Sequence, residues 1–147
     1  MTRYYDTGVL LKLYTLEDES DAVRAFVTKH GEPLYLHGFH LSEAVSALRL
    51  KCFRKECSEE ESAAAIADLE DDIASGVIRR VGIEWDDAWS ACRSLSQAHA
   101  AATGCRTLDA LHVACARSLA LREFVTSDSR QTALAARCGL SPVNPLG

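Results

Sequence analysis

Short apolar segments with β propensity alternate with longer amphipathic segments along almost the whole sequence. Strands are expected at residues 3–5, 33–38, 77–83 and 123–128. Helices are expected at residues 7–17, 20–31, 41–55, 58–76, 84–102, 107–121 and 129–139. Alternation of strands and helices at this spacing predicts an α/β sandwich with a mainly parallel sheet.

The chain has the length of one domain. Its 147 residues can bury a substantial core without disulfides or a structural metal, so residues 1–147 are expected to form a single domain. No apolar run approaches the length of a membrane span, and Asp6 interrupts any signal-peptide core near the start. A cytoplasmic protein without a membrane partner is therefore the default expectation.

The net charge and the cysteine pattern exclude some classes of protein. The net charge of −5 argues against a simple basic nucleic-acid binder, whose affinity comes from Lys and Arg side chains that neutralise phosphates. This charge is compatible with an enzyme that binds phosphate groups through bound cations. The six cysteines include no C-x-x-C pair and no zinc-like spacing, so they are expected to be free thiols that pack as small apolar residues.

Four acidic residues stand where strands end or helices begin. Asp6 and Asp128 end the first and last predicted strands, and Glu43 and Asp109 lie in the first turns of helices. In a parallel sheet, ligands bind at the carboxyl ends of the strands. The four carboxylates are therefore expected to converge on one edge of the sheet.

Each acidic residue also has a simpler explanation, because acids are common at helix starts. Asp6 and Asp128 can cap helices, and Glu43 and Asp109 can complement helix dipoles. Four clustered carboxylates, however, repel one another. A hard divalent cation such as Mg²⁺ or Mn²⁺ relieves that repulsion, and it can activate water and neutralise a phosphoryl group.

Four segments together carry a family resemblance. They are YYDTGVLLKLY at residues 4–14, LSEAVSALRLK at 41–51, RTLDALHVACA at 106–116 and FVTSDSRQTALAARCGLSPVNP at 124–145. In this order and at this spacing, the chain resembles the PIN domain family, and most closely its VapC-type toxins of type II toxin–antitoxin pairs. The resemblance covers essentially the whole chain and implies a three-layer α/β/α sandwich around a mainly parallel sheet.

The resemblance also implies an activity, cleavage of RNA by a Mg²⁺- or Mn²⁺-dependent endoribonuclease. Its four acids correspond to Asp6, Glu43, Asp109 and Asp128, which would act in catalysis and in metal binding. Thr7 and Thr126 match supporting hydroxyl positions. Two positions depart from the family pattern: Gly8 stands where Ser or Asn is common, and Ser127 stands where an apolar residue is common.

Roles and partners follow from the same resemblance. Asp6 and Asp109 would bind the primary metal, Glu43 would hold a water or act as base, and Asp128 would complete a second metal position. Arg49, Lys51 and Arg54 on one predicted helix are candidates for contact with the RNA backbone, although a solvated helix face is the better explanation for any one of them. A cognate antitoxin and a homodimer are the implied partners.

Two alternative functions stay open at this point. The chain could be a housekeeping PIN nuclease of RNA processing or decay, or a non-catalytic PIN-like binding module. Retention of all four acids argues against the second alternative. A phosphoaspartyl enzyme of the haloacid dehalogenase type fits poorly, because it needs a second Asp where this sequence has Gly8.

Overall fold

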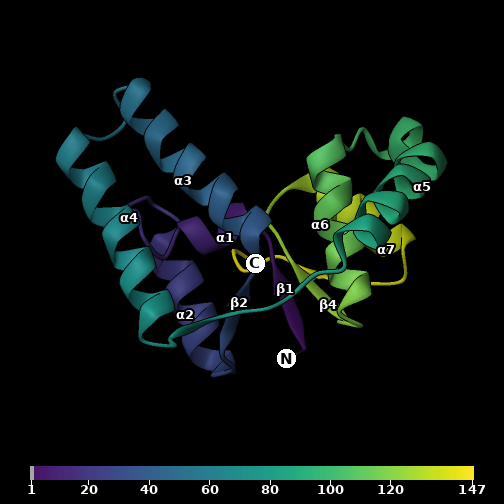
Figure 1. Cartoon of the computed structure of the whole chain (residues 1–147), viewed down its shortest axis with the longest axis horizontal. Coiled ribbons are helices and arrows are strands. Elements are labelled where there is room, and N and C mark those ends of the chain that lie inside the picture. Colours follow the sequence, from purple (N-terminus) through teal and green to yellow (C-terminus); the bar gives the residue numbers. More distant parts are fainter. Residues whose placement is uncertain (1) are drawn as a thin grey trace. The chain divides into compact units, whose positions relative to one another are not determined.

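The computed structural model describes residues 2–147 as two compact units. The terminal unit combines the residues up to Asp6 with Gly82–Gly147, and the middle unit is Thr7–Val81. Each unit pairs a small parallel sheet with helices, so the predicted α/β class with parallel strands is confirmed. Figure 1 shows the elements in chain order.

The terminal unit is built on a three-stranded parallel sheet of order β1-β4-β5. Its strands are β1 (Arg3–Tyr5), β4 (Glu123–Val125) and β5 (Ser141–Val143). Its helices are α5 (Trp85–Thr103), α6 (Thr107–Ser118) and α7 (Ser129–Arg137).

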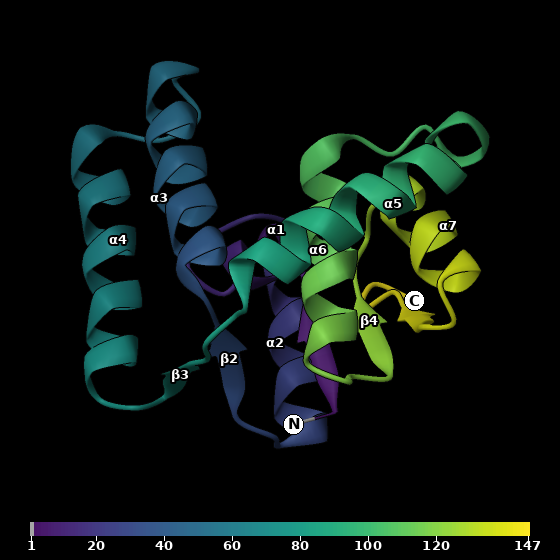
Figure 2. The ribbon, with the colours of Figure 1, turned by 45° about the vertical axis from the view of Figure 1, so that its right-hand side comes forward.

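Helix α6 forms the centre of the terminal unit. All residues from Ala110 to Ala116 are buried, because α6 packs against other elements on every side of this stretch. Tyr4 of β1 stacks on Phe124 of β4, and its hydroxyl lies 2.7 Å from Nδ1 of His112 on α6. The helix runs antiparallel to β1 and β4 (Figures 1 and 2). Its N-terminus therefore lies at the carboxyl edge of the sheet.

The middle unit pairs β2 (Leu34–Leu36) with β3 (Ile78–Arg80) in parallel. Its helices are α1 (Thr7–Leu11), α2 (Ser20–His30), α3 (Gly38–Phe53) and α4 (Glu59–Ala74). Helices α3 and α4 form an antiparallel hairpin, seen side by side in Figure 2. The predicted capping box at the start of α4 is present: Ser58 and Glu61 exchange side chain-to-backbone hydrogen bonds of 3.0 and 3.1 Å.

Several predicted boundaries are wrong. The helix expected at 7–17 ends at Leu11, because the next three amides bond to carbonyls only three residues back and tighten the chain into turns. The strand expected at 33–38 ends at Leu36, and α3 begins at Gly38 rather than at residue 41. Strand β5 was not predicted, because it is short and contains Pro142, a residue typical of edge strands.

Membrane association through a spanning helix has no basis in the part of the chain that the structure describes. Within residues 2–147, no helix combines the length and the apolar character that crossing a bilayer requires.

Candidate active site

The ladder between β1 and β4 places two polar residues side by side at the carboxyl edge of the sheet. Tyr5 pairs with Val125, so the next residues, Asp6 and Thr126, leave the sheet together. The Asp6 amide still donates to the carbonyl oxygen of Val125, at 3.0 Å. Both side chains are buried, with Asp6 5% exposed and Thr126 0% exposed. A buried carboxylate needs compensating polar partners, and this edge supplies them.

The hydroxyl of Thr126 is the central partner of Asp6. It donates to Oδ2 of Asp6 at 2.6 Å and lies 2.9 Å from the side-chain oxygen of Gln131. It also accepts a hydrogen bond from the Asp128 amide at 3.0 Å. A threonine hydroxyl has one proton, and the shorter contact with the carboxylate indicates where that proton goes. Thr126 therefore fixes the orientation of Asp6 and ties it to the turn that carries Asp128.

Asp128 caps helix α7. Its Oδ1 accepts hydrogen bonds from the amides of Arg130 and Gln131, both at 2.9 Å. The simple capping role weighed for this residue is therefore realised. Its other carboxylate oxygen makes no hydrogen bond within residues 2–147, and the residue is exposed. Capping thus occupies only one of the two carboxylate oxygens.

Asp109 follows the same pattern at the start of α6. Its Oδ2 accepts a hydrogen bond from the amide of Arg106 at 2.9 Å. Its Oδ1 has no hydrogen-bond partner among the described residues, and the side chain is half-buried. Because α6 runs antiparallel to β1 and β4 (Figure 1), the N-terminus of α6, where Asp109 is the third residue, lies toward the carboxyl edge of the sheet. Three of the four predicted acids thus belong to the terminal unit, at the end of β1 and at the starts of α6 and α7.

The fourth acid belongs to the middle unit. Glu43 lies in the second turn of α3, not in the first, because that helix begins at Gly38. Its Oε1 accepts a 2.7 Å hydrogen bond from the hydroxyl of Thr7. Thr7 directly follows Asp6 in the chain. Both predicted supporting hydroxyls are therefore bonded to predicted acids, Thr7 to Glu43 and Thr126 to Asp6.

The donor chemistry fits a hard divalent cation. The carboxylates and hydroxyls that the terminal unit gathers are oxygen donors, which Mg²⁺ and Mn²⁺ prefer. Asp109 and Asp128 each keep one oxygen without a hydrogen bond among residues 2–147. At Oδ2, Asp6 accepts a hydrogen bond from the neutral hydroxyl of Thr126. Asp6, Asp109 and Asp128 of the terminal unit, and Glu43 of the middle unit, stay the predicted ligands of such an ion.

The basic residues predicted to contact nucleic acid are mostly engaged inside the middle unit. Arg49 bonds to Glu59 at 2.6 Å and to the Ser62 hydroxyl at 3.2 Å. Lys51 forms ion pairs with Glu17 and Glu56. Arg54 is exposed and makes no ion pair among the described residues. Contact between these three side chains and RNA stays a prediction, and two of them would have to exchange a carboxylate for a phosphate.

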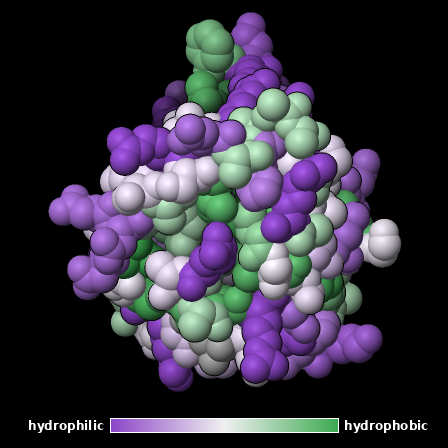
Figure 3. All heavy atoms as spheres, turned by 90° about the vertical axis from the view of Figure 1, so that its right-hand side faces the viewer, coloured by the Kyte–Doolittle hydropathy of each residue, from purple (hydrophilic) through white to green (hydrophobic). Residues whose placement is uncertain are grey.

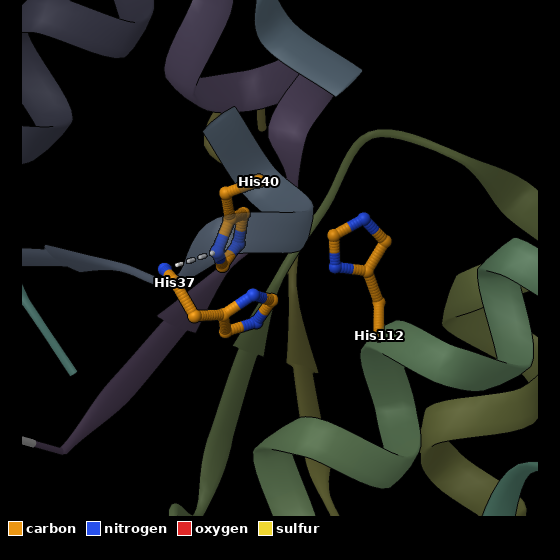
Figure 4. Close-up of side chains that lie close together, drawn as sticks. All are labelled: His37, His40 and His112. Atoms are coloured by element: carbon orange, nitrogen blue, oxygen red, sulfur yellow. Dashed lines mark hydrogen bonds between the residues drawn. The ribbon is translucent and has the colours of Figure 1, made fainter. Parts of the chain in front are cut away.

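The histidines near the predicted site residues have structural partners. His40, expected in a loop, lies buried in the first turn of α3. Its Nδ1 accepts a hydrogen bond from the His37 amide at 3.3 Å, as the dashed line in Figure 4 shows. His112 on α6 was expected to pack within the helix layer, and its contact with Tyr4 agrees with that expectation.

The cysteine thiols and the two tryptophans differ in how far they are buried. All six cysteines are free, and Cys92, Cys105 and Cys115 are buried. Burial raises the pKa of Cys115 to about 12, so this thiol is a poor nucleophile. Trp85 and Trp89 were expected to pack in the core or in a dimer; they are 36% and 49% exposed, so they are not core residues.

Sequence reasoning missed Gln131. This residue is buried, and its side chain joins the hydrogen-bond group of Thr126. A signal for it exists in the sequence. Gln131 lies three and four residues before Leu134 and Ala135, which are the buried positions of α7. A polar residue on the apolar face of a helix indicates a buried polar network.

Comparisons with known proteins agree with this architecture. A family model described as the PIN domain matches residues 3–137. A comparison with curated proteins finds no significant match. Among solved structures, the chain is similar to FitAcB from Neisseria gonorrhoeae, with a TM-score of 0.67 and 19% identity over 99% of this chain and 98% of that one. It is also similar to FitAB bound to an IR36 DNA fragment, with a TM-score of 0.69 and 17% identity over 100% of this chain and 96% of that one. At these identities the likeness shows the fold, and the predicted PIN-like α/β fold is confirmed.

Proposed function

Because the chain belongs to the PIN domain family, we propose that it is a metal-dependent endoribonuclease and the toxin of a VapBC-type toxin–antitoxin pair. Members of this family are generally metal-dependent nucleases. The observation that carries the proposal is the bonded group Asp6–Thr126–Asp128 at the carboxyl edge of the sheet, together with Asp109 in the first turn of α6. We also propose that residues 1–147 act as a single PIN domain, since the family match spans both compact units.

The proposed reaction is hydrolysis of an RNA phosphodiester bond. When bound at these carboxylates, Mg²⁺ or Mn²⁺ would supply activation of a water molecule and neutralisation of charge on the phosphoryl group. Thr126 holds Asp6 in one orientation, and the helix-capping bonds hold Asp109 and Asp128. Such fixed ligands need no rearrangement during the reaction.

Glu43 is the proposed general base. Thr7 orients its carboxylate through the 2.7 Å hydrogen bond to Oε1, and this carboxylate would take a proton from the attacking water. The water oxygen bonds to phosphorus, the bond from phosphorus to the 3′-oxygen breaks, and that oxygen takes up a proton. The products then carry a 5′-phosphate and a 3′-hydroxyl.

The partners follow from the proposed role. We propose a cognate antitoxin that covers the carboxylate edge; a guanidinium group would suit it, because it pairs with two carboxylate oxygens at once. One similar structure is described as FitAB bound to a DNA fragment. With a net charge of −5, this chain is not itself expected to supply the main contact with DNA. A homodimer in the cytoplasm completes the proposal.

Cleavage of labelled RNA by purified protein tests the function. A panel of transfer, ribosomal and messenger RNAs is incubated with Mg²⁺, with Mn²⁺ and with EDTA. We expect cutting only with metal, and a loss of more than about 100-fold in Asp6→Asn and Asp109→Asn. The matched control is Asp87→Asn, since Asp87 is the third residue of α5 just as Asp109 is the third residue of α6.

The same experiment separates the alternatives. Cutting without metal, or undiminished cutting by both variants, contradicts the proposed site. No cutting and no metal binding would favour the non-catalytic binding module. Metal-dependent cutting by a protein whose gene has no neighbouring antitoxin reading frame would favour the housekeeping nuclease over the toxin.

A further inference from the structure

Two arginines of the terminal unit stand beside the candidate acids. Arg106 precedes α6 and donates its amide hydrogen to Asp109 at 2.9 Å. Arg130 lies in the first turn of α7 and donates its amide hydrogen to Asp128 at 2.9 Å. Both side chains are exposed. The backbone of each arginine is thus fixed by an acid of the site, while its side chain is left to solvent.

Packing brings Arg130 to the segment that carries Arg106. Helix α5 ends at Gly104, whose φ of +70° lies in the left-handed region that glycine adopts most readily. A Cβ atom on Gly104 would lie 3.9 Å from Nε of Arg130. The guanidinium end of Arg130 therefore lies against the short connection from α5 to α6, two residues before Arg106. Arg130 of α7 thus lies against the same connecting segment that contains Arg106.

In the part of the chain that the structure describes, the side-chain charges of these two arginines have no ionic partner. Among residues 2–147, neither guanidinium forms an ion pair or a hydrogen bond. Arg49 and Lys51, by contrast, hold carboxylates. On the face shown in Figure 3, hydrophilic and hydrophobic side chains are interspersed rather than gathered in one area. What distinguishes Arg106 and Arg130 is their position beside Asp109 and Asp128.

We propose that Arg106 and Arg130 bind backbone phosphates of the RNA strand that flank the bond to be cut. The inference rests on the proposed nuclease function and deepens it. A guanidinium binds phosphate through two parallel hydrogen bonds, and it does so without regard to base sequence. Two such contacts offset the repulsion between an acidic protein and RNA, and they set the direction in which the strand crosses the acids. Arg106 and Arg130 are thus positioning residues.

Binding of a fluorescein-labelled, random-sequence, single-stranded RNA 20-mer tests the proposal. Fluorescence anisotropy is measured in EDTA, where metal-dependent cutting cannot occur, at several salt concentrations. Arg106→Gln and Arg130→Gln are compared with Arg117→Gln and Arg137→Gln. The controls are exposed and lie in the last turns of helices, Arg117 in α6 and Arg137 in α7, at the opposite end from Arg106 and Arg130 but on nearly the same helix face. Thermal unfolding of every variant verifies the fold.

The expected result is a loss of affinity specific to the two proposed arginines. One phosphate contact to a single strand contributes about 0.7 to the slope of log affinity against log salt, which is roughly fivefold in affinity at 0.1 M salt. Each proposed variant should lose about that much, and the double variant about 25-fold, while the controls change less than about twofold. With Mg²⁺ and a cleaved RNA, KM should rise more than kcat falls.

Three outcomes would overturn the proposed role of Arg106 and Arg130. The proposal is overturned if wild-type protein binds and cuts RNA but Arg106→Gln and Arg130→Gln bind as tightly as wild type; the nuclease function then stands. It is also overturned if all four variants weaken binding equally, which would indicate diffuse attraction. If the wild-type chain neither binds nor cuts RNA, the proposed function fails and this inference fails with it.

Discussion

The hydroxyl of Thr126 donates a 2.6 Å hydrogen bond to Oδ2 of Asp6, a residue 120 positions earlier in the chain. The bond exists because β1 and β4 are paired in parallel with Tyr5 opposite Val125, so that the next residue of each strand emerges at the same edge. It joins the first predicted acid to the turn that carries the last one. The behaviour of this pair is therefore a sensitive test of the site.

Replacing Thr126 with valine keeps the shape of the side chain and removes the hydroxyl. Asp6 and the Asp128 amide each lose a buried partner, which should cost about 1–3 kcal/mol in the free energy of unfolding. RNA cleavage should fall about 10- to 100-fold, because the ligand is no longer oriented. Thr126→Ser retains the hydroxyl and should keep activity within about threefold. Equal activity of the two variants would show that the hydrogen bond does not matter.

Two variants of Asp128 separate its two roles. Asn caps helices about as well as Asp but carries no charge. Ala carries no charge either, and it cannot cap a helix. Asp128→Asn should therefore leave the urea midpoint nearly unchanged and lower metal-dependent cleavage, since the oxygen without a hydrogen bond can no longer act as an anionic ligand. Asp128→Ala should lose the activity and also about 1 kcal/mol of stability. Full activity in Asp128→Asn would restrict this residue to capping.

The hydrogen bond from Thr7 to Glu43 predicts non-additive effects on catalysis. If Thr7 acts only by orienting Glu43, Thr7→Val should lower cleavage about 10- to 100-fold on its own. The same change made in Glu43→Gln should add little, because the oriented base is already lost. The measurement is a double-mutant cycle on kcat/KM with one RNA substrate. Multiplicative losses would mean that the two residues act independently.

Tyr14 provides a prediction about stability against pH. Burial, together with the 2.5 Å hydrogen bond that its hydroxyl donates to Asp72, raises the pKa of Tyr14 above its ordinary value. Because the folded pKa is raised, the contribution is fully present below about pH 10, the ordinary tyrosine pKa, and declines above it. Tyr14→Phe should cost about 1 kcal/mol at pH 7. Urea unfolding from pH 7 to 11 should show this difference shrinking above pH 10; a difference that grows there would contradict the account.

Much of the fold can be predicted from the sequence, because local sequence signals and tertiary packing favour the same elements. The capping box of Ser58 and Glu61 and the glycine at position 76 define α4 without tertiary information. Strand β5 is different. It is held by its pairing with β4, and its Pro142 argues locally against a strand, so only the tertiary structure defines it.

The candidate site could be predicted only in part, because some of its features depend on tertiary structure. Acids at strand ends and helix starts indicate an edge, but their hydrogen bonds depend on register. The bond between Asp6 and Thr126 follows from the pairing of Tyr5 with Val125, which the sequence does not specify. Pairing of Arg49 and Lys51 with acids on other segments was equally beyond local reasoning. Local sequence patterns give little information about contacts between side chains that are far apart in the sequence.

The most direct test of the central claim is a calorimetric titration of Mn²⁺ into the wild-type protein, Asp109→Asn and Asp87→Asn. We predict saturable binding by the wild type and by Asp87→Asn, and at least about tenfold weaker binding by Asp109→Asn. Both substituted acids occupy the third position of a helix and lose the same charge. The difference between them therefore isolates the carboxylate edge. Equal binding by all three proteins, or no binding by the wild type, would contradict a metal site at Asp6, Asp109 and Asp128.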